Sequence, residues 1–565
     1  MISTFPARRF VLTLALPLVA SGSALAQGGP PPPPPPPPLQ ALQPPPVPAQ
    51  NPITESKRVL GKMLFWDEQL SSGDTVSCGT CHQPGAGGKD GRAGLASLHP
   101  GPDGILGTAD DRMGSHGVLR ADVFGNYKPD ATFEFEEQAT DRSSPSNLMA
   151  AYFPSLFWDG RATGQFLDPE TGALVIPVGG ALENQSVGPI LSDVEMADEG
   201  RTWNDVTSKL AGAKPLALAW DLPLDLASAL VSDPSYPELF QAAFGTQDIT
   251  ARRIGMALAT YQRTLVPNQT PLDNFLNGNP GALTPLQQQG LQAFASPQAR
   301  CNVCHSGTNF SDGQFHNLGL RPISEDAGRF DITGVFADRG RFKTPSLRNV
   351  ALKNSFFHNG DVAIDSLADA VNFYDNSGGL FADNRDPVLN GLNLNPIDVT
   401  RIVALLGALT DPRVAAETFP FDRPMMNSER APGLVENMGG GVAGMGGIVP
   451  TVITTTPAHT GASEFRVGLK DALGSSRGFV AFTLGEPGHP IQNTATRRLA
   501  RLKTDGSGAG DGYATFQMGI PDDPSLSGVE LFVQFSIQDH SVIGNASLPV
   551  TGSFSKSDTI RMTIQ

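Results

Sequence analysis

The pentapeptide CGTCH occupies residues 78–82, and a second string of the same pattern, CNVCH, occupies residues 301–305. Two thiols at this spacing can bond to the two vinyl groups of one porphyrin, and the histidine that follows them then lies beneath the iron. A zinc site would require the two distant cysteine pairs to converge, and a dithiol redox pair needs no histidine after its second cysteine. The strings therefore predict two covalently bound c-type haems. Their predicted attachment residues and iron ligands are Cys78, Cys81, His82, Cys301, Cys304 and His305.

The segments that lead to each string have helical periodicity. Apolar residues between positions 59 and 64 fall on one helix face, and Thr284, Pro285 and Gln287 form an N-cap, a first-turn proline and a capping-box partner before the second string. We therefore expect a mainly α fold, with two tandem cytochrome c haem domains at residues 52–283 and 284–424.

The sequence changes character after residue 424. We expect a Gly- and Met-rich linker at residues 425–450, and period-two alternation at 465–469 and 531–537 predicts strands. Residues 451–565 should therefore form a β-rich, sandwich-like domain. No catalytic constellation is evident in it.

The N-terminus predicts export. A pair of arginines, an apolar stretch and an A-x-A site are typical of a signal peptide, here over residues 1–26, and the proline-rich residues 27–51 predict an extended linker. We expect a protein of the periplasm or cell exterior, without a membrane span. The formal charge of −16 argues against nucleic acid as a partner and favours a basic redox protein.

Several segments resemble the bacterial di-haem cytochrome c peroxidase and MauG family, and the resemblance extends over residues 54–424. The segments that carry it are LGKMLF at 60–65, FWDGR at 157–161, Glu195-Met196, RTL at 263–265 and FKTPSLRN at 342–349. The resemblance implies that hydrogen peroxide is reduced at the N-terminal haem and that electrons pass through the C-terminal haem. It also implies a small redox protein, a cytochrome c or a cupredoxin, as electron donor, or an oxidisable protein side chain as in MauG.

The resemblance assigns roles to three residues near the first haem. Gln185 and Glu195 have the ten-residue spacing of the family's distal glutamine and glutamate. A carboxylate above the iron can move a proton from one peroxide oxygen to the other, as cleavage of the O–O bond requires. Trp158 matches a tryptophan that relays electrons between the haems. An insertion at residues 163–180 is a candidate to reshape the entrance to this site.

Tyr374 occupies the place where other peroxidases of the family have a methionine ligand to the second haem. A phenolate favours ferric iron and a thioether favours ferrous iron, so the difference is chemical. This tyrosine is similar to the MauG branch and predicts Tyr374 as an iron ligand. The alternatives are that Tyr374 only packs and that Met425, Met426 or water binds the iron. His358 is expected near the second haem without binding its iron.

Two further candidates concern the first haem and a calcium ion. His116 could be the histidine that caps the first haem in some members of the family. Calcium is a candidate ion between the haems, although the family's asparagine is replaced by Ser143 in this chain. Asp103, Asp110 and Asp111 offer a second cluster of oxygen ligands, for which a solvated acidic loop is the alternative.

Two other functions remain open. One is a di-haem oxygenase that uses dioxygen at the first haem, with the insertion at 163–180 lining a tunnel for an organic substrate. The other is a non-enzymatic electron carrier, which predicts two six-coordinate haems and no reaction with peroxide.

Overall fold

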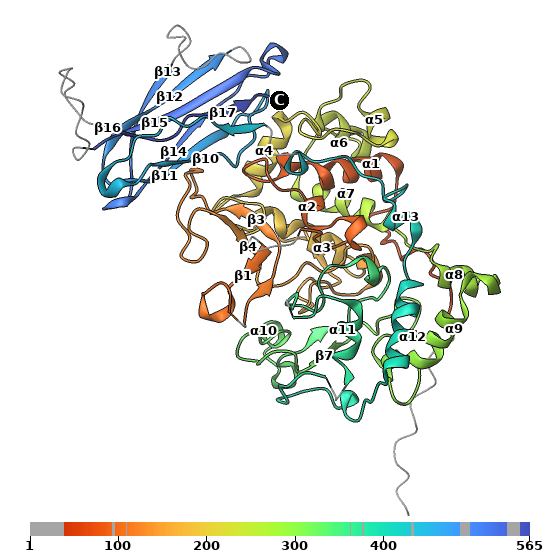
Figure 1. Ribbon diagram of the computed structural model, residues 1–565. Coiled ribbons are helices and arrows are strands. Elements are labelled where there is room, and N and C mark those ends of the chain that lie inside the picture. Colours follow the sequence, from red (N-terminus) through yellow and green to blue (C-terminus); the bar gives the residue numbers. More distant parts are fainter. Residues whose placement is uncertain are drawn as a thin grey trace, which may run out of the picture. The chain divides into compact units, whose positions relative to one another are not determined.

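The computed structural model in Figure 1 describes residues 39–92, 97–108, 110–361, 363–375, 378–430, 434–485, 498–539 and 554–565. Leu39–Gln565 form one compact unit. The predicted signal peptide and the proline-rich residues up to 38 lie outside the described residues. Within the described ranges, no helix is both long enough and apolar enough to cross a bilayer.

Helices build the first haem half. Helix α1 (Glu55–Trp66) begins at Thr54, whose side chain accepts a hydrogen bond from the Lys57 amide, and its apolar face packs against α7 (Ala251–Thr264). Leu60, Leu64 and Leu258 from these two helices belong to one buried core. The other helices of this half are α2 (Cys78–Cys81), α3 (Ala181–Val187), α4 (Trp203–Gly212), α5 (Leu224–Ala229) and α6 (Tyr236–Phe244).

The second half is also helical, and α9 (Pro285–Phe294) begins with the predicted capping box. The Thr284 side chain accepts from the Gln287 amide, and the Gln287 side chain accepts from the Thr284 amide. Helix α9 packs closely against α12 (Pro396–Gly407), because Gly290 leaves room for the Arg401 carbonyl. The remaining helices are α8 (Pro271–Leu276), α10 (Phe330–Thr333), α11 (Leu367–Asn372) and α13 (Pro412–Ala415).

The mainly α prediction is confirmed only in part, because the loops between these helices pair into short antiparallel sheets. Each of these sheets has two strands. They pair β1 (Leu98–His99) with β2 (Arg112–Met113), β3 (His116–Leu119) with β4 (Glu137–Ala139), β5 (Phe166–Leu167) with β6 (Leu174–Ile176), and β7 (Phe315–His316) with β8 (Phe342–Lys343). The strands are two to four residues long, too short to give a period-two signal in the sequence.

The C-terminal part consists of two antiparallel sheets that share one apolar core. Phe465 and Val467 from the first sheet and Val480 and Phe535 from the second contribute to this core. The first sheet has the order β10 (Thr451–Ile453), β11 (Phe465–Leu473), β14 (Ala509–Met518). The second has the order β13 (Arg498–Lys503), β12 (Arg477–Gly485), β15 (Glu530–Gln538), β17 (Ile560–Thr563), β9 (Val435–Asn437), and β16 (Phe554–Lys556) also pairs with β15.

Strand β9 differs from the prediction, because it comes from the segment expected to be a linker. Residues 435–437 pair with β17 through the backbone and remain exposed. An exposed edge strand needs no apolar side chains, so its composition does not distinguish it from a linker.

Two buried ion pairs fix the helices next to the predicted sites. Arg263 on α7 donates to both carboxylate oxygens of Glu183 on α3, at 2.6 and 2.7 Å, and both side chains are almost fully buried. Arg348 binds both oxygens of Asp273 in the same way, at 2.8 and 2.9 Å. The first pair positions the helix that carries Gln185.

Candidate active site

The first CxxCH string forms a one-turn helix that starts at Ser77. His82 follows it, and its Nδ1 lies 3.0 Å from the Gly88 carbonyl oxygen. A proton on Nδ1 that is donated to this carbonyl leaves Nε2 free to bind a metal. Burial lowers the pKa of His82, which favours the neutral ring that metal binding requires. Cys78, Cys81 and His82 all line one cavity, so these residues fit a haem with an axial histidine.

Gly79 is held against the ring of Trp66. A Cβ at this position would lie 2.1 Å from Trp66 Cε3, and Trp66 is almost fully buried. We expect Gly79→Ala to cost about 1–3 kcal/mol by overpacking and to displace the helix that carries both thiols. Thermal unfolding and haem content per chain measure the effect. Gly212→Ala is the matched control, because nothing lies within 4 Å of its added Cβ; equal losses in both variants would contradict this explanation.

Gln185 and Glu195 line the same cavity as the first string. Gln185 belongs to α3, and Glu195 follows the short 3₁₀ turn at Pro189–Leu191. Burial raises the pKa of Glu195, with a smaller contribution from Asp141, whereas Arg161 acts in the opposite direction. Arg161 also lines the cavity and lies 3.6 Å from the Phe157 ring centroid. A carboxylate whose pKa is raised by burial inside a cavity is a candidate group for proton transfer.

His116 lines this cavity too, but its imidazole is engaged elsewhere. Nε2 lies 2.9 Å from Ser97 Oγ, and Nδ1 lies 3.2 Å from Glu137 Oε2. The residue starts strand β3. In this conformation neither nitrogen is free, which disfavours the expectation that His116 caps the first haem.

The insertion at residues 163–180 does not line the cavity, which disfavours the expectation that it reshapes the entrance. It forms the β5–β6 hairpin, whose Phe166 and Ile176 pack with Met256 of α7. None of its residues lines either cavity. The hairpin packs the inserted residues against α7. The length of an insertion does not by itself predict where the inserted residues pack.

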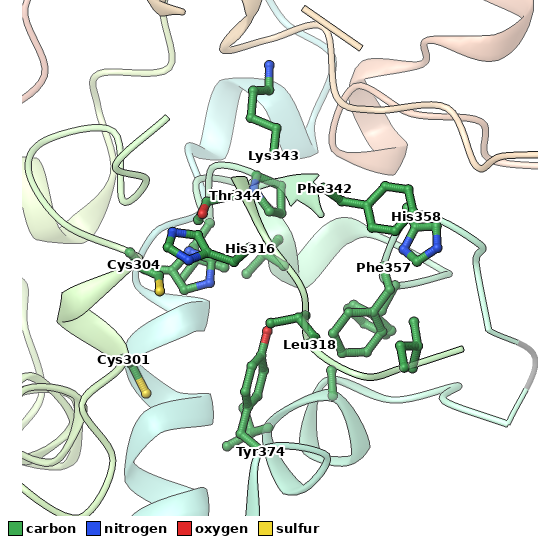
Figure 2. A pocket seen from close by; sticks show the side chains of 18 of the residues that line it. Cys301, Cys304, His316, Leu318, Phe342, Lys343, Thr344, Phe357, His358 and Tyr374 are labelled. Carbon is green, nitrogen blue, oxygen red and sulfur yellow. The ribbon is translucent and has the colours of Figure 1, made fainter. Parts of the chain in front are cut away.

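The second string lines a separate cavity, which Figure 2 shows from close by. His305 Nδ1 lies 3.0 Å from the Phe310 carbonyl oxygen, the same arrangement as at His82. Tyr374 lines this cavity from the turn that follows α11, and its hydroxyl lies beside Leu318 in Figure 2. Burial raises the pKa of Tyr374, with further contributions from the two nearby cysteines. Cys301, Cys304, His305 and Tyr374 therefore converge on one cavity that fits a second haem.

The two methionines weighed as alternatives to Tyr374 lie elsewhere. The Met426 sulfur accepts a hydrogen bond from Ser77 Oγ at 3.1 Å, beside the first string. The Met425 backbone pairs with Trp220. Neither methionine lines the second cavity, which leaves Tyr374 and water as the candidate ligands there.

Trp158 lines both cavities. Its indole Nε1 donates to the Ser143 carbonyl oxygen at 2.7 Å, and its ring lies edge-on to His358 with centroids 6.4 Å apart. His358 stacks on Phe342 at 3.5 Å. Burial lowers the pKa of His358 to about 3, so its ring is neutral at physiological pH. Trp158 therefore borders both cavities and contacts a neutral imidazole beside them.

The zinc alternative is disfavoured, because the two strings line different cavities. In the described part of the chain, only Cys304, Asp312 and His316 bring three potential ligand atoms within 4.8 Å of one another. Hydrogen bonds to Asp312, to Cys304 and to Asp386 raise the pKa of His316 to about 11. A protonated imidazole has no lone pair for a metal. His316 was missed by the sequence analysis, since its partners are 4 and 70 residues away.

The calcium candidates gain no support. Lys89 Nζ lies 2.6 Å from Ser143 Oγ, and an ammonium at this hydroxyl would compete with a cation. In the acidic loop, Asp110 accepts from the Asp103 amide, and Asp111 accepts from the Gly107 amide. These carboxylates therefore accept hydrogen bonds from backbone amides of their own loop.

The chain is similar to known proteins over its two haem halves. Residues 55–281 match the family described as di-haem cytochrome c peroxidase. The chain is 30% identical over 335 residues to the methylamine utilization protein MauG of Methylorubrum extorquens, covering 59% of this chain and 72% of that one. It is 29% identical over 392 residues to cytochrome c551 peroxidase of Pseudomonas aeruginosa, covering 66% and 87%. A crystal structure of a MauG-like protein associated with microbial copper homeostasis aligns with a TM-score of 0.48 at 24% identity, over 67% of this chain and 96% of that one.

Proposed function

Because the chain belongs to the di-haem cytochrome c peroxidase and MauG family, we propose that it reduces hydrogen peroxide at a haem held by Cys78, Cys81 and His82. A second haem, held by Cys301, Cys304 and His305, passes electrons to the first. Both haems are attached through the thiols. The protein is exported, and its electrons come from a small cytochrome c or cupredoxin, or from an oxidisable protein side chain.

The observation that carries this proposal is that Gln185 and Glu195 line the cavity of the first string. The haem, when bound there, supplies the iron that binds peroxide and accepts electrons. The overall reaction consumes two electrons and two protons for each peroxide and forms two water molecules. The protein must therefore deliver protons to the oxygens as well as electrons to the iron.

Glu195 is the residue we assign to proton transfer. Its carboxylate would accept a proton from one oxygen of the peroxide and return it to the other, which is the proton transfer that cleavage of the O–O bond to give water requires. Burial raises its pKa, so the group holds a proton more strongly than an exposed glutamate does. The Gln185 amide orients the peroxide by hydrogen bonding. Trp158 relays electrons between the two cavities that it lines.

Tyr374 is proposed as the ligand that distinguishes the second haem. An anionic phenolate stabilises ferric iron, whereas a thioether stabilises ferrous iron. We expect Tyr374→Met to raise the reduction potential of the second haem, with the first haem still able to react with peroxide. Redox titration followed by absorption and EPR spectroscopy measures the change. Tyr513→Met, in strand β14, is the control; an unchanged potential in Tyr374→Met would show that the phenolate does not bind the iron.

Absorption and EPR spectra of the purified protein, with and without hydrogen peroxide, test the proposal. We expect the first haem to change on addition of peroxide. Two six-coordinate haems whose spectra do not change on addition of peroxide would instead identify an electron carrier. Reaction with dioxygen and an organic substrate, but not with peroxide, would identify an oxygenase.

A further inference from the structure

Three lysine side chains lie between the two cavities, and neither the motifs nor the proposed mechanism uses them. Lys343 and Lys353 line both cavities, and Lys89 lines the second. Lys89 and Lys343 are buried, and Lys353 is half-buried. We refer to these three residues as the lysine cluster.

The cluster joins the two haem halves. Lys89 follows the first string by a few residues, yet its Nζ donates to the Ser355 carbonyl oxygen at 3.1 Å and contacts Ser355 Oγ. The loop that carries Lys89 packs closely against the segment that carries Lys353. The approach is so close that a Cβ added to Gly87 would lie 2.7 Å from the Asn349 carbonyl oxygen. A lysine from the first half therefore lines the cavity of the second string.

Lys343 reaches in the opposite direction. It belongs to β8, in the second half, and its amide donates to the Trp158 carbonyl oxygen at 2.8 Å. Its Nζ donates to the Ser155 carbonyl oxygen at 2.9 Å. Figure 2 shows this side chain pointing away from Cys304 and His316. The lysine thus extends from the second pocket toward the first half.

Acidic side chains offset the positive charges of the cluster only from a distance, since Asp90 acts on Lys89 and Asp159 on Lys343 without direct contact. None of the three lysines forms an ion pair within the part of the chain that the structure describes. Burial lowers the pKa of Lys89 and Lys343 to about 7 and that of Lys353 to about 8. Burying an ammonium group without a paired counter-charge is energetically unfavourable. Three such groups around two cavities point to an anionic ligand group that the polypeptide does not provide.

We propose that Lys343 and Lys353 bind carboxylate groups of the two haems, that Lys89, whose three N–H donors are held by Ser143 and Ser355, adds its positive charge beside them, and that the cluster thereby sets the reduction potentials of the haem pair. The proposal rests on the haem assignment made above. Each haem carries two carboxylates on its edge, and the cavities that fit the haems are the ones that the cluster lines. A small free anion, such as phosphate, offers the same oxygen chemistry and is the other source of the counter-charge. Lys89 donates to Ser143 Oγ, so its ammonium also occupies the position considered for calcium.

Redox titration of the full-length, haem-loaded protein tests the role of the cluster. We expect Lys353→Met to keep two haems per chain and to lower the reduction potential of at least one haem, because a nearby positive charge favours the reduced state. Lys353→Arg should restore the potential, since it retains the charge. Lys214→Met is the control, because Lys214 is exposed and pairs with Asp233 at 2.9 Å, away from both cavities. Potentials equal to wild type in Lys353→Met would overturn the proposal.

Two measurements on the wild-type protein keep the proposal testable if the variant does not fold. Resonance Raman spectra should show the carboxylate-bending bands of haems whose carboxylates are hydrogen-bonded, and bands typical of free carboxylates would overturn the proposal. Exchanging chloride for phosphate at constant ionic strength should leave the potentials unchanged. A shift with phosphate would show that a free anion occupies the cluster. A wild-type protein without haem would instead refute the proposed function itself.

Discussion

Replacing Glu195 with glutamine is expected to slow the reaction with hydrogen peroxide by ~10²-fold or more, the usual effect of losing a positioned acid–base group. This factor corresponds to about 2.7 kcal/mol of transition-state stabilisation. Glutamine has nearly the same shape and cannot accept the peroxide proton, so the haem spectra should change little. Stopped-flow absorbance after mixing with peroxide measures the rate.

The pH dependence gives a second test of Glu195. The carboxylate must be ionised to accept a proton from peroxide, and burial raises its pKa. The wild-type rate should therefore increase with pH through this raised pKa, and the increase should be absent in Glu195→Gln. Glu199→Gln is the matched control, because Glu199 binds Arg120 at 2.7 Å and does not line the cavity. A Glu195→Gln rate equal to that of wild type would remove this residue from the mechanism.

Replacing Cys301 with alanine is expected to abolish covalent attachment of the second haem in most chains. One thioether bond cannot form without its thiol, and the second half builds its core around the cavity that Cys301 borders. The first haem should remain, because Cys78, Cys81 and His82 line a separate cavity. The haem retained after denaturation, measured as pyridine haemochrome, should fall from two per chain toward one.

The corresponding control lies inside the same string. Asn302 contributes no thiol, so Asn302→Ala should retain both haems while it perturbs the same turn. Cys78→Ala should show the reverse pattern, with loss of the first haem. Retention of two covalent haems in Cys301→Ala would contradict the assignment of the string.

Much of the candidate site could be predicted from local sequence, because the chemistry depends on short spacings. The CxxCH strings place two thiols and an imidazole within five residues, and the helix caps at Thr54 and Thr284 are local as well. Gln185 and Glu195 line one cavity as the family resemblance implied. Their roles, and that of Tyr374 as an iron ligand, remain predictions.

Other features of the fold depend on contacts between residues far apart in the sequence, which short sequence motifs do not predict. The insertion at 163–180 was expected at the site entrance, but its hairpin buries Phe166 against α7. Strand β9 joins its sheet through backbone pairing alone. The burial of Lys89 and Lys353 depends on a loop from one half that packs against a segment of the other, and a lysine in sequence gives no sign of such burial.

Titration of the oxidised, haem-loaded protein with hydrogen peroxide tests the central claim most directly. Peroxide is a two-electron oxidant, and the pair of haems can supply both electrons. The account predicts a change in the haem absorption bands that is complete at one peroxide per chain and that decays when a reduced cytochrome c or cupredoxin is added. Absorption bands that remain unchanged in excess peroxide would contradict it.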